Sequence, residues 1–261
     1  MGKRIGLAAV AAVTAAVALT SCVRLVEHGF EDRHTVGERI TEVRLRNGSG
    51  DIVVRGRAGA DSTEVRRRLQ YPKNAAAPSG VSHRVEGTTL VLDGCGHRCT
   101  VDYEVTVPSE DVRVVGESES GDVRFEDVAA VEVEIGSGDA VIRGVSGEVR
   151  IGDDSGDVEV ADVGGGFTGR LGSGNASLSG MRGAVTLDSR SGDVHVRLDA
   201  ATSVRAVAGS GNVVVQVPRV PYRVDVGTDS GELEVGVPDD PGAPVELYLR
   251  ASSGDVDVLA A

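Results

Sequence analysis

The sequence contains no tryptophan, and aromatic residues make up only 3% of it, whereas hydrophobic residues reach 40%. A core without large rings must be built from aliphatic side chains, and the β-branched residues among them favour strands. The scarcity of aromatic rings also removes the stacking platforms on which proteins bind single-stranded nucleic acids. These absences predict a thin core made of strands.

Basic residues are also scarce: 27 Lys and Arg stand against 40 Asp and Glu, a net charge of −13. Lysine occurs only at Lys3 and Lys73. An acidic surface repels phosphate backbones, so we expect no nucleic-acid partner.

The first residues have the pattern of an export signal. Lys3 and Arg4 precede an uncharged apolar run from Ile5 to Leu19, which is typical of a secretory signal peptide and short for a membrane span. The run leads into Ser21 and Cys22, which resemble a bacterial lipobox, in which cleavage leaves a lipid-modified cysteine at the start of the mature chain. We therefore expect residues 1–21 to be a lipoprotein signal peptide, Cys22 to carry the membrane lipid, and residues 22–35 to form a tether. The alternative is a plain signal peptide or short anchor in which Cys22 is incidental.

The other two cysteines, Cys95 and Cys99, lie between two runs that read as strands. Outside the cell they would form a disulfide at a hairpin tip. A metal site that uses Cys95, His97 and Cys99 is the alternative, but no second pair of ligands lies nearby.

A repeat dominates the second half of the chain. The tripeptide Ser-Gly-Asp, or a close variant of it, recurs from Ser120 onward in steps of 17, 18, 18, 18, 19, 20 and 23 residues. The positions three and five residues after each Ser are all apolar, as in Val158 and Val160, and charged or polar residues alternate with them. Period-2 alternation on both sides of a turn predicts two short strands per repeat with one face buried.

These features predict an all-β fold, a β-solenoid with coils of about 18 residues and two short strands per coil. We expect residues 36–111 to form an N-terminal β region with an insertion and the cysteine hairpin, continuous with a repeat solenoid over residues 112–261. Turn geometry explains the tripeptide, because Gly permits positive φ and the Ser and Asp side chains can bond to nearby backbone groups. The predicted structural turn residues are Ser120, Gly121, Asp122, Ser137, Gly138, Asp139, Ser155, Gly156, Asp157, Ser191, Gly192 and Asp193.

The same stacked acids could instead bind calcium, as in RTX β-rolls, but the Gly-Gly-x-Gly-x-Asp turn of that family is missing from the other half of each repeat. We therefore expect no metal. The motif GxGxxG at Gly164, Gly166 and Gly169 lacks a following helix, and His195 falls on an outward position. No catalytic residue or cofactor is predicted, although β-helical polysaccharide lyases and hydrolases are an enzymatic alternative.

The string Tyr103 to Pro108, then Val112 to Val114 and the Ser-Gly-Asp-Val units from Ser120, resembles the DUF4097 family of adhesin-like proteins. The resemblance covers roughly residues 36–259. It implies a β-helix-like fold and a non-catalytic, envelope-associated binding or scaffold role in bacteria, outside the cytoplasm, with a protein or cell-wall partner. A regulatory role through a sensor or another membrane protein is the alternative. The Pro-rich stretches 217–221 and 238–244 depart from the repeat, so we expect distorted coils there.

Overall fold

The structure is a computed structural model in which residues 27–261 are described. The predicted signal peptide and Cys22 lie outside these residues. From Glu27 onward the elements are all strands, and this part of the chain holds no helix long and apolar enough to cross a membrane. The fold is thus all-β, as the repeat predicts.

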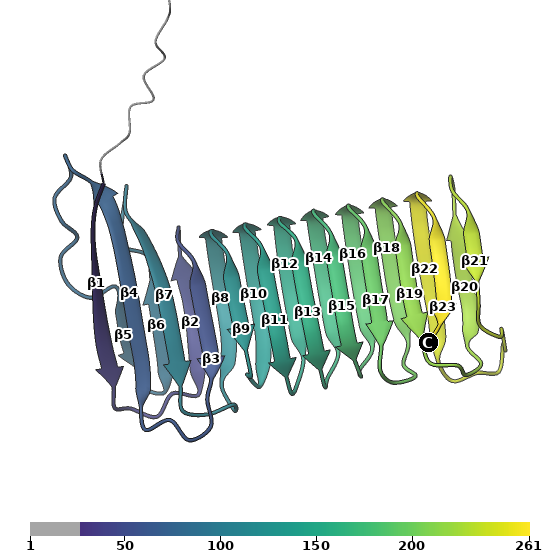
Figure 1. The fold of residues 1–261 in the computed structure, drawn as a ribbon, viewed down its shortest axis with the longest axis horizontal. Helices are drawn as coiled ribbons and strands as arrows, with labels where there is room; N and C mark the ends of the chain where they lie inside the picture. Colours follow the sequence, from purple (N-terminus) through teal and green to yellow (C-terminus); the bar gives the residue numbers. More distant parts are fainter. Residues whose placement is uncertain (1–26) are drawn as a thin grey trace, which may run out of the picture.

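The strands form two sheets that face each other along the length of the molecule (Figure 1). Sheet A has 12 strands and sheet B has 11. In spatial order, sheet A contains β1 (Glu27–Val36), β4 (Thr63–Pro72), β7 (Thr100–Val107), β3 (Ile52–Gly56), β9 (Val123–Glu126), β11 (Ala140–Val145), β13 (Val158–Val163), β15 (Ala176–Met181), β17 (Val194–Leu198), β19 (Val213–Val217), β23 (Val256–Ala260) and β21 (Leu233–Val235). Sheet B contains β20 (Arg223–Thr228), β22 (Glu246–Ser253), β18 (Val204–Ser210), β16 (Val185–Ser191), β14 (Phe167–Ser173), β12 (Val149–Ser155), β10 (Ala130–Ser137), β8 (Arg113–Ser120), β2 (Glu42–Asn47), β6 (Thr89–Asp93) and β5 (His83–Glu86).

From β8 to β19 the chain winds as a regular solenoid. Each coil runs up one strand of sheet B, turns a corner at the tripeptide and returns along a strand of sheet A. Equivalent strands of successive coils pair in parallel, so that Val149 lies beside Phe167 and Val158 beside Ala176. The predicted solenoid with two strands per coil is confirmed.

The core is the narrow space between the sheets. The columns three and five residues after each tripeptide Ser point inward, and from β9 to β19 and in β23 these side chains are at most 2% exposed. Small and β-branched side chains fill this space because the two sheets leave room for one layer from each.

The N-terminal region belongs to the same body. The pair β2 and β3 stacks directly on β8 and β9, and β6 and β7 stack on β2 and β3. Beyond β7, the strands β4 and β1 extend sheet A in antiparallel pairing, and β5 extends sheet B.

The prediction of a tether over residues 22–35 is wrong for the part that the structure describes. Residues Glu27–Val36 form β1, which pairs along its whole length with β4. Acidic residues of β1 face the arginine run of β4, and Asp32 lies opposite Arg67. These ion pairs hold a segment whose composition alone looked like a linker.

The C-terminal coils are not stacked in chain order. The last pair, β22 and β23, lies directly on β18 and β19, with Ser253 beside Ser210, and the earlier pair β20 and β21 lies outside it (Figure 1). The expectation of one continuous series of coils through residue 261 is therefore wrong at this end. The Pro-rich segments connect these coils: segment 217–221 carries the chain from β19 outward past one empty coil position to β20, and segment 238–244 brings it back to that position at β22. Pro has no N–H to donate to a parallel ladder, so these segments are suited to be connections instead of strands.

Candidate functional site

The tripeptides lie at the corner where each coil passes from sheet B to sheet A. Their glycines have positive φ, with 118° at Gly121, 129° at Gly138, 154° at Gly156 and 120° at Gly192. A side chain there would be strained by φ alone.

Stacking sets a second requirement for glycine at the corner. A Cβ added at Gly138 would lie 2.3 Å from the carbonyl oxygen of Gly121, and one at Gly156 would lie 2.0 Å from that of Gly138. The corners pack backbone on backbone, so any larger residue would force the coils apart.

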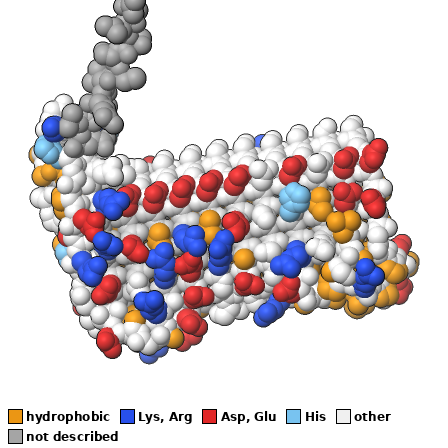
Figure 2. All heavy atoms as spheres, in the orientation of Figure 1, with side chains coloured by type: hydrophobic (Ala, Val, Ile, Leu, Met, Phe, Trp, Pro, Cys, Tyr) orange, Lys and Arg blue, Asp and Glu red, His pale blue; other side chains and the backbone are white. Residues whose placement is uncertain are grey.

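The third residue of each tripeptide forms a ladder with the next coil. Its side-chain Oδ1 accepts a hydrogen bond from the backbone N–H of the equivalent residue one coil further along, at N···O distances between 2.7 and 3.1 Å. In spatial order the ladder joins Asp102, Asp51, Asp122, Asp139, Asp157, Asn175, Asp193, Asn212, Asp255 and Glu232. Figure 2 shows it as a row of red side chains along the molecule, interrupted where Asn replaces Asp.

The ladder explains why the third position is Asp or Asn: only these side chains are short enough to return to the backbone of the adjacent corner. Each Oδ1 points along the solenoid axis toward an amide instead of converging with its neighbours. Within residues 27–261, no group of three or more His, Cys, Asp or Glu side chains is placed to hold a metal ion.

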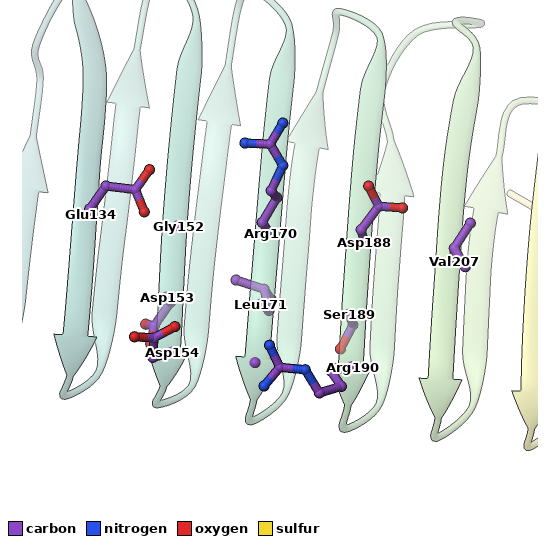
Figure 3. A pocket seen from close by; sticks show the side chains of 11 residues that line it. Glu134, Gly152, Asp153, Asp154, Arg170, Leu171, Asp188, Ser189, Arg190 and Val207 are labelled. Carbon is purple, nitrogen blue, oxygen red and sulfur yellow. The ribbon is translucent and has the colours of Figure 1, made fainter.

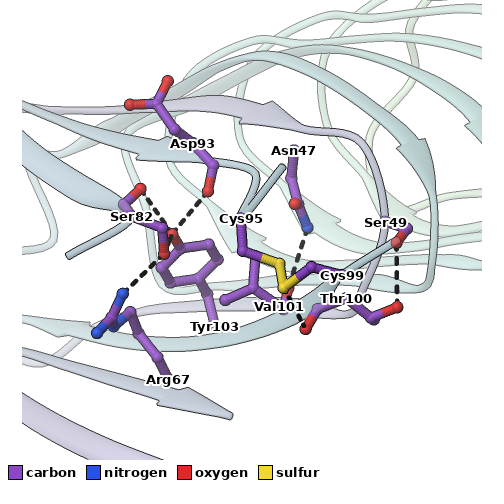
Figure 4. The surroundings of a disulfide bond; sticks show 10 residues. All are labelled: Asn47, Ser49, Arg67, Ser82, Asp93, Cys95, Cys99, Thr100, Val101 and Tyr103. Carbon is purple, nitrogen blue, oxygen red and sulfur yellow. Dashed lines mark hydrogen bonds between the residues drawn. A yellow bond between two sulfur atoms is a disulfide. The ribbon is translucent and has the colours of Figure 1, made fainter. Parts of the chain in front are cut away.

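Cys95 and Cys99 form a disulfide, with Cα atoms 5.7 Å apart, in the turn between β6 and β7 (Figure 4). Both sulfurs are used in this bond, so the alternative metal site of Cys95, His97 and Cys99 has no free thiol. The buried Asn47 donates from Nδ2 to the carbonyl oxygen of Val101, at 3.2 Å, and so attaches the start of β7 to the first corner.

A buried polar cluster lies beside this turn. The guanidinium of Arg67, 1% exposed as a residue, is paired with the carboxylate of Asp32 and donates to Ser82 Oγ at 2.9 Å. The hydroxyl of Tyr103 lies 2.8 Å from the carbonyl oxygen of Ser82 and 2.7 Å from that of Asp93 (Figure 4). Burial raises the pKa of Tyr103 to about 12.

Two histidines complete the cluster at the N-terminal end of the solenoid. The ring of His34 lies 5.0 Å from that of His83, and its Nε2 is 3.2 Å from Asp32 Oδ1. Burial lowers the pKa of His83 to about 4, and the charges of His34 and Arg67 act in the same direction. These groups come from β1, β4 and β5, so they join both sheets at this end.

The outer face of sheet A carries paired charges. Arg55 bridges two strands, with Nη1 2.7 Å from Glu104 and Nε 2.7 Å from Glu126, and Arg143 pairs with Glu159 on the next coil. Such ladders of opposite charge stabilise neighbouring strands modestly and leave few groups for a ligand.

Both outer faces are hollowed: on sheet A a depression of about 570 Å³ lies beside the paired Arg55 and Glu104, and on sheet B two depressions adjoin. A depression of about 480 Å³ lies over β12, β14 and β16, and a second of about 730 Å³ continues from it toward β2. Glu134, Gly152 and Arg170 line both. In Figure 3, Glu134, Arg170 and Asp188 project from sheet B, and the carboxylate of Glu134 lies over Gly152, which has no side chain to displace it.

The charges around this hollow are not paired with one another. Among the described residues, neither Arg170 nor Arg190 forms an ion pair, although Glu134, Asp154 and Asp188 line the same depression. Unpaired charges of both signs in an open depression can bind a polar ligand or another protein. We take the outer face of sheet B as the candidate binding surface.

A buried acid lies just behind this surface. Asp153 is 3% exposed and takes an inward position between Ile135 and Leu171 of the flanking coils. Burial raises its pKa to about 6, with smaller contributions from the charges of Asp139, Asp154 and Asp157. Sequence reasoning missed this residue, because its column also holds the buried Ser118 and Ser189 beside the apolar Ile135 and Leu171, so a polar residue there does not stand out.

The weak enzymatic signals of the sequence fall on ordinary structural positions. Gly164 and Gly166 lie in the turn between β13 and β14, and Gly169 lies within β14, so no helix follows the motif. His195 projects outward from β17, as expected.

The architecture defines a class, an elongated two-sheet β-solenoid with glycine corners. The chain belongs to the Toastrack DUF4097 family, whose family model matches residues 35–259. No curated protein matches it.

Solved structures with a similar fold include a candidate adhesin of Bacteroides fragilis NCTC 9343, 15% identical, with 89% of this chain and 97% of that chain covered and a TM-score of 0.49. A candidate lipid-binding protein of Parabacteroides distasonis ATCC 8503 is 12% identical, with 88% of this chain and 96% of that chain covered and a TM-score of 0.45.

Proposed function

We propose that the protein is a non-catalytic, adhesin-like binding module, anchored by a lipid on Cys22 outside the cytoplasm, and that the outer face of sheet B binds its partner in the cell envelope. The observation that carries this proposal is the hollow over β12, β14 and β16, where Arg170 and Arg190 have no ion-pair partner among the described residues. Each corner acid instead uses one carboxylate oxygen to pair with the next coil, which gives these residues a structural role.

Anchoring at Cys22 suits this geometry. Four residues lie between Cys22 and Glu27, the first residue of β1, so the two are five positions apart. A chain of that length spans at most about 18 Å, so the N-terminal end of the solenoid would stay close to the membrane. With 12 strands in sheet A at a spacing of about 4.8 Å, the other end would reach roughly 50 Å further when the solenoid stands upright.

The arrangement of the polar groups favours binding over catalysis. A hydrolase or lyase needs an acid and a base that converge on one bond, commonly beside aromatic platforms for the sugar. Here the acids of the hollow are spread over separate strands of one face, and its lining contains no aromatic residue.

The test is co-sedimentation of the purified protein with isolated cell-wall sacculi and, separately, with membrane vesicles from the same cells. The double variant Arg170→Glu/Arg190→Glu should lose at least tenfold in affinity for the fraction that binds the parent. The control is Arg182→Glu/Arg197→Glu, which makes the same change in charge at exposed sites away from the hollow. Equal binding by both variants, or no binding by the parent to either fraction, would reject the proposal.

A further inference from the structure

The N-terminal end of the solenoid carries an exposed aromatic side chain. Phe30 of β1 lies opposite Leu69 of β4, so the two side chains share the inner face of sheet A. Leu69 is 1% exposed, whereas Phe30 is 36% exposed. Beyond β6 and β7, sheet A continues with two strands and sheet B with the four residues of β5, so among the described residues β1 has no counterpart in sheet B. The ring of Phe30 is therefore left at the surface.

The loop between β4 and β5, residues 73–82, adds apolar side chains to this end. Val81 is 53% exposed, and two of the three alanines at 75–77 are exposed as well. Figure 1 shows the loop outside β1 and β4, at the end of the solenoid. The loop thus forms the outermost part of the described chain on this side.

Contacts of the buried Arg67 join the strand to the loop. Arg67 is paired with Asp32, which lies two positions after Phe30 on the same face of β1. It also donates a hydrogen bond to Ser82, the residue that follows Val81. Phe30 and Val81 are therefore held at the same end of the molecule.

Basic residues accompany these apolar side chains. Lys73, the only lysine after the predicted signal peptide, is exposed in the loop. Arg98, exposed in the disulfide turn at residues 94–99, donates to Oδ1 of Asn74 in the same loop, at 3.4 Å. Neither residues 71–82 nor the disulfide turn contains an acid, although acids outnumber basic residues by 40 to 27 in the whole chain. Figure 2 shows basic and hydrophobic side chains at this end.

The chain that leads from Cys22 reaches the solenoid at the same place. Glu27, where β1 begins, lies beside Pro72, where β4 ends and the loop follows. The five positions from Cys22 to Glu27 span at most about 18 Å. A lipid on Cys22 would therefore hold the loop close to the bilayer.

We propose that the N-terminal end is a membrane-docking surface, in which Phe30 and Val81 enter the headgroup region of the bilayer and Lys73 and Arg98 contact anionic phospholipid headgroups. This proposal rests on the lipid anchor at Cys22, which is part of the function proposed above. An apolar tip with basic residues beside it suits a bilayer surface, because the apolar groups enter the interface while anionic lipids attract the basic groups.

Docking through this end would fix the orientation of the solenoid. The long axis would stand away from the bilayer instead of lying along it. The hollow of sheet B, which lies about six strand positions from β1, would then be held roughly 30 Å from the membrane. The proposed binding surface would face the space beyond the lipid headgroups.

Tryptophan probes test the docking surface, because the chain has no tryptophan of its own. The full lipid-modified protein carrying Val81→Trp is reconstituted into vesicles of phosphatidylcholine and phosphatidylglycerol. Its fluorescence should fall at least twofold when brominated phosphatidylcholine replaces the ordinary lipid. The matched control is Leu259→Trp, which replaces a side chain that is 39% exposed near the opposite end of the solenoid and should not be quenched.

Flotation of the same vesicles separates the docking surface from the anchor. Protein that fails to float would reject the anchor, and the docking surface with it. Protein that floats while Val81→Trp stays unquenched would overturn the docking surface alone. Equal quenching of Val81→Trp and Leu259→Trp would mean that the solenoid lies flat on the bilayer, which would also overturn the proposal.

Charge reversal tests the contribution of anionic lipids. Added to Val81→Trp, the double change Lys73→Glu/Arg98→Glu should weaken the quenching at least twofold in the same vesicles. Arg182→Glu/Arg197→Glu makes the same change in charge at exposed sites on the repeat coils and should leave the quenching unchanged. Circular dichroism melts identify any variant that fails to fold. Equal quenching in the two charge variants would overturn the assignment of anionic lipid to Lys73 and Arg98.

Discussion

Asp139 Oδ1 accepts a hydrogen bond from the backbone N–H of Asp157 at 2.9 Å, and the N–H of Asp139 donates to Asp122 at the same distance. Each corner residue is thus an acceptor for one neighbouring coil and a donor to the other. The corner acids are part of the backbone pairing of the solenoid, which is why Asn replaces them at Asn175 and Asn212 without a break.

The ladder predicts different effects for two substitutions at one position. Asp139→Ala removes the acceptor for the N–H of Asp157 and should lower the free energy of unfolding by about 1 kcal/mol. Asp139→Asn keeps an oxygen acceptor and should remain within about 0.5 kcal/mol of the parent. Urea unfolding followed by circular dichroism measures both. Equal losses for the two variants would argue against the hydrogen bond.

Gly156 and Gly59 form a matched pair for the corner. Both have positive φ, but a Cβ at Gly156 would collide with the carbonyl of Gly138, whereas one at Gly59 meets nothing within 4 Å. Gly59→Ala should cost about 1 kcal/mol from backbone strain alone, and Gly156→Ala about 3 kcal/mol. If Gly59→Ala and Gly156→Ala lower the melting temperature equally, the contact between backbones at the corner is not the reason that glycine is required there.

The buried carboxyl group of Asp153 predicts an unusual dependence of the free energy of unfolding on pH. Its pKa is raised from 3.8 to about 6 in the folded protein, so the folded state holds the proton more tightly and the contribution of this residue to stability falls as pH rises from about 4 to 6. Asp153→Asn should therefore raise the free energy of unfolding at pH 7 by about 2 kcal/mol and have little effect at pH 3.5. The outward neighbour supplies the control, Asp154→Asn, which leaves the buried carboxylate of Asp153 in place and should therefore show none of the stabilisation at pH 7 expected of Asp153→Asn. A stabilisation of Asp153→Asn that is independent of pH would contradict the assignment.

The ladder also predicts that calcium is not required. Each Asp Oδ1 already accepts an amide, and the carboxylates run in a line instead of converging, whereas calcium needs 6 to 8 oxygens around one point. Thermal melts in chelator and in millimolar calcium should coincide once ionic strength is matched. A calcium-specific rise in Tm that persists in high sodium chloride would favour the RTX-like alternative.

Lipid attachment predicts a simple labelling result. Cells fed a clickable fatty acid should label the parent chain but not Cys22→Ala, which should also keep its signal peptide and migrate more slowly in gels. Cys95→Ala/Cys99→Ala should still be labelled, because those sulfurs form the disulfide. Label on Cys22→Ala, or none on the parent, would reject the anchor.

The repeat region could be predicted in detail from the sequence because each coil imposes the same constraints. An inward position such as Val160 must be apolar, and a corner position such as Gly156 must lack a side chain, so the pattern recurs wherever coils stack. The order of the coils carries no such signal. The inward residues of β22, which lies beside β18, are apolar, and so are those of β20, the next strand of this sheet in the chain, so the pattern does not say which of the two pairs with β18. The strand β1 was missed because ion pairs to distant residues, such as Asp32 to Arg67, hold it in place.

The binding surface was equally hard to see from sequence. The hollow on sheet B depends on Gly152 lying between Glu134 and Arg170 across three coils, a relation that exists only after the coils are in register. Locally, Gly152 is one more glycine in a chain that has 36.

The reversed order of the last coils has a consequence for biogenesis. Because β22 and β23 fit between strands that precede them in the chain, β20 and β21 have no neighbouring coil to pair with until the later segment has been made. A solenoid that stacks coil by coil from its N-terminal end would stop after β19, with one apolar end uncovered, and would finish only when β22 and β23 insert. During that interval chaperones or proteases would have access to the unfinished end.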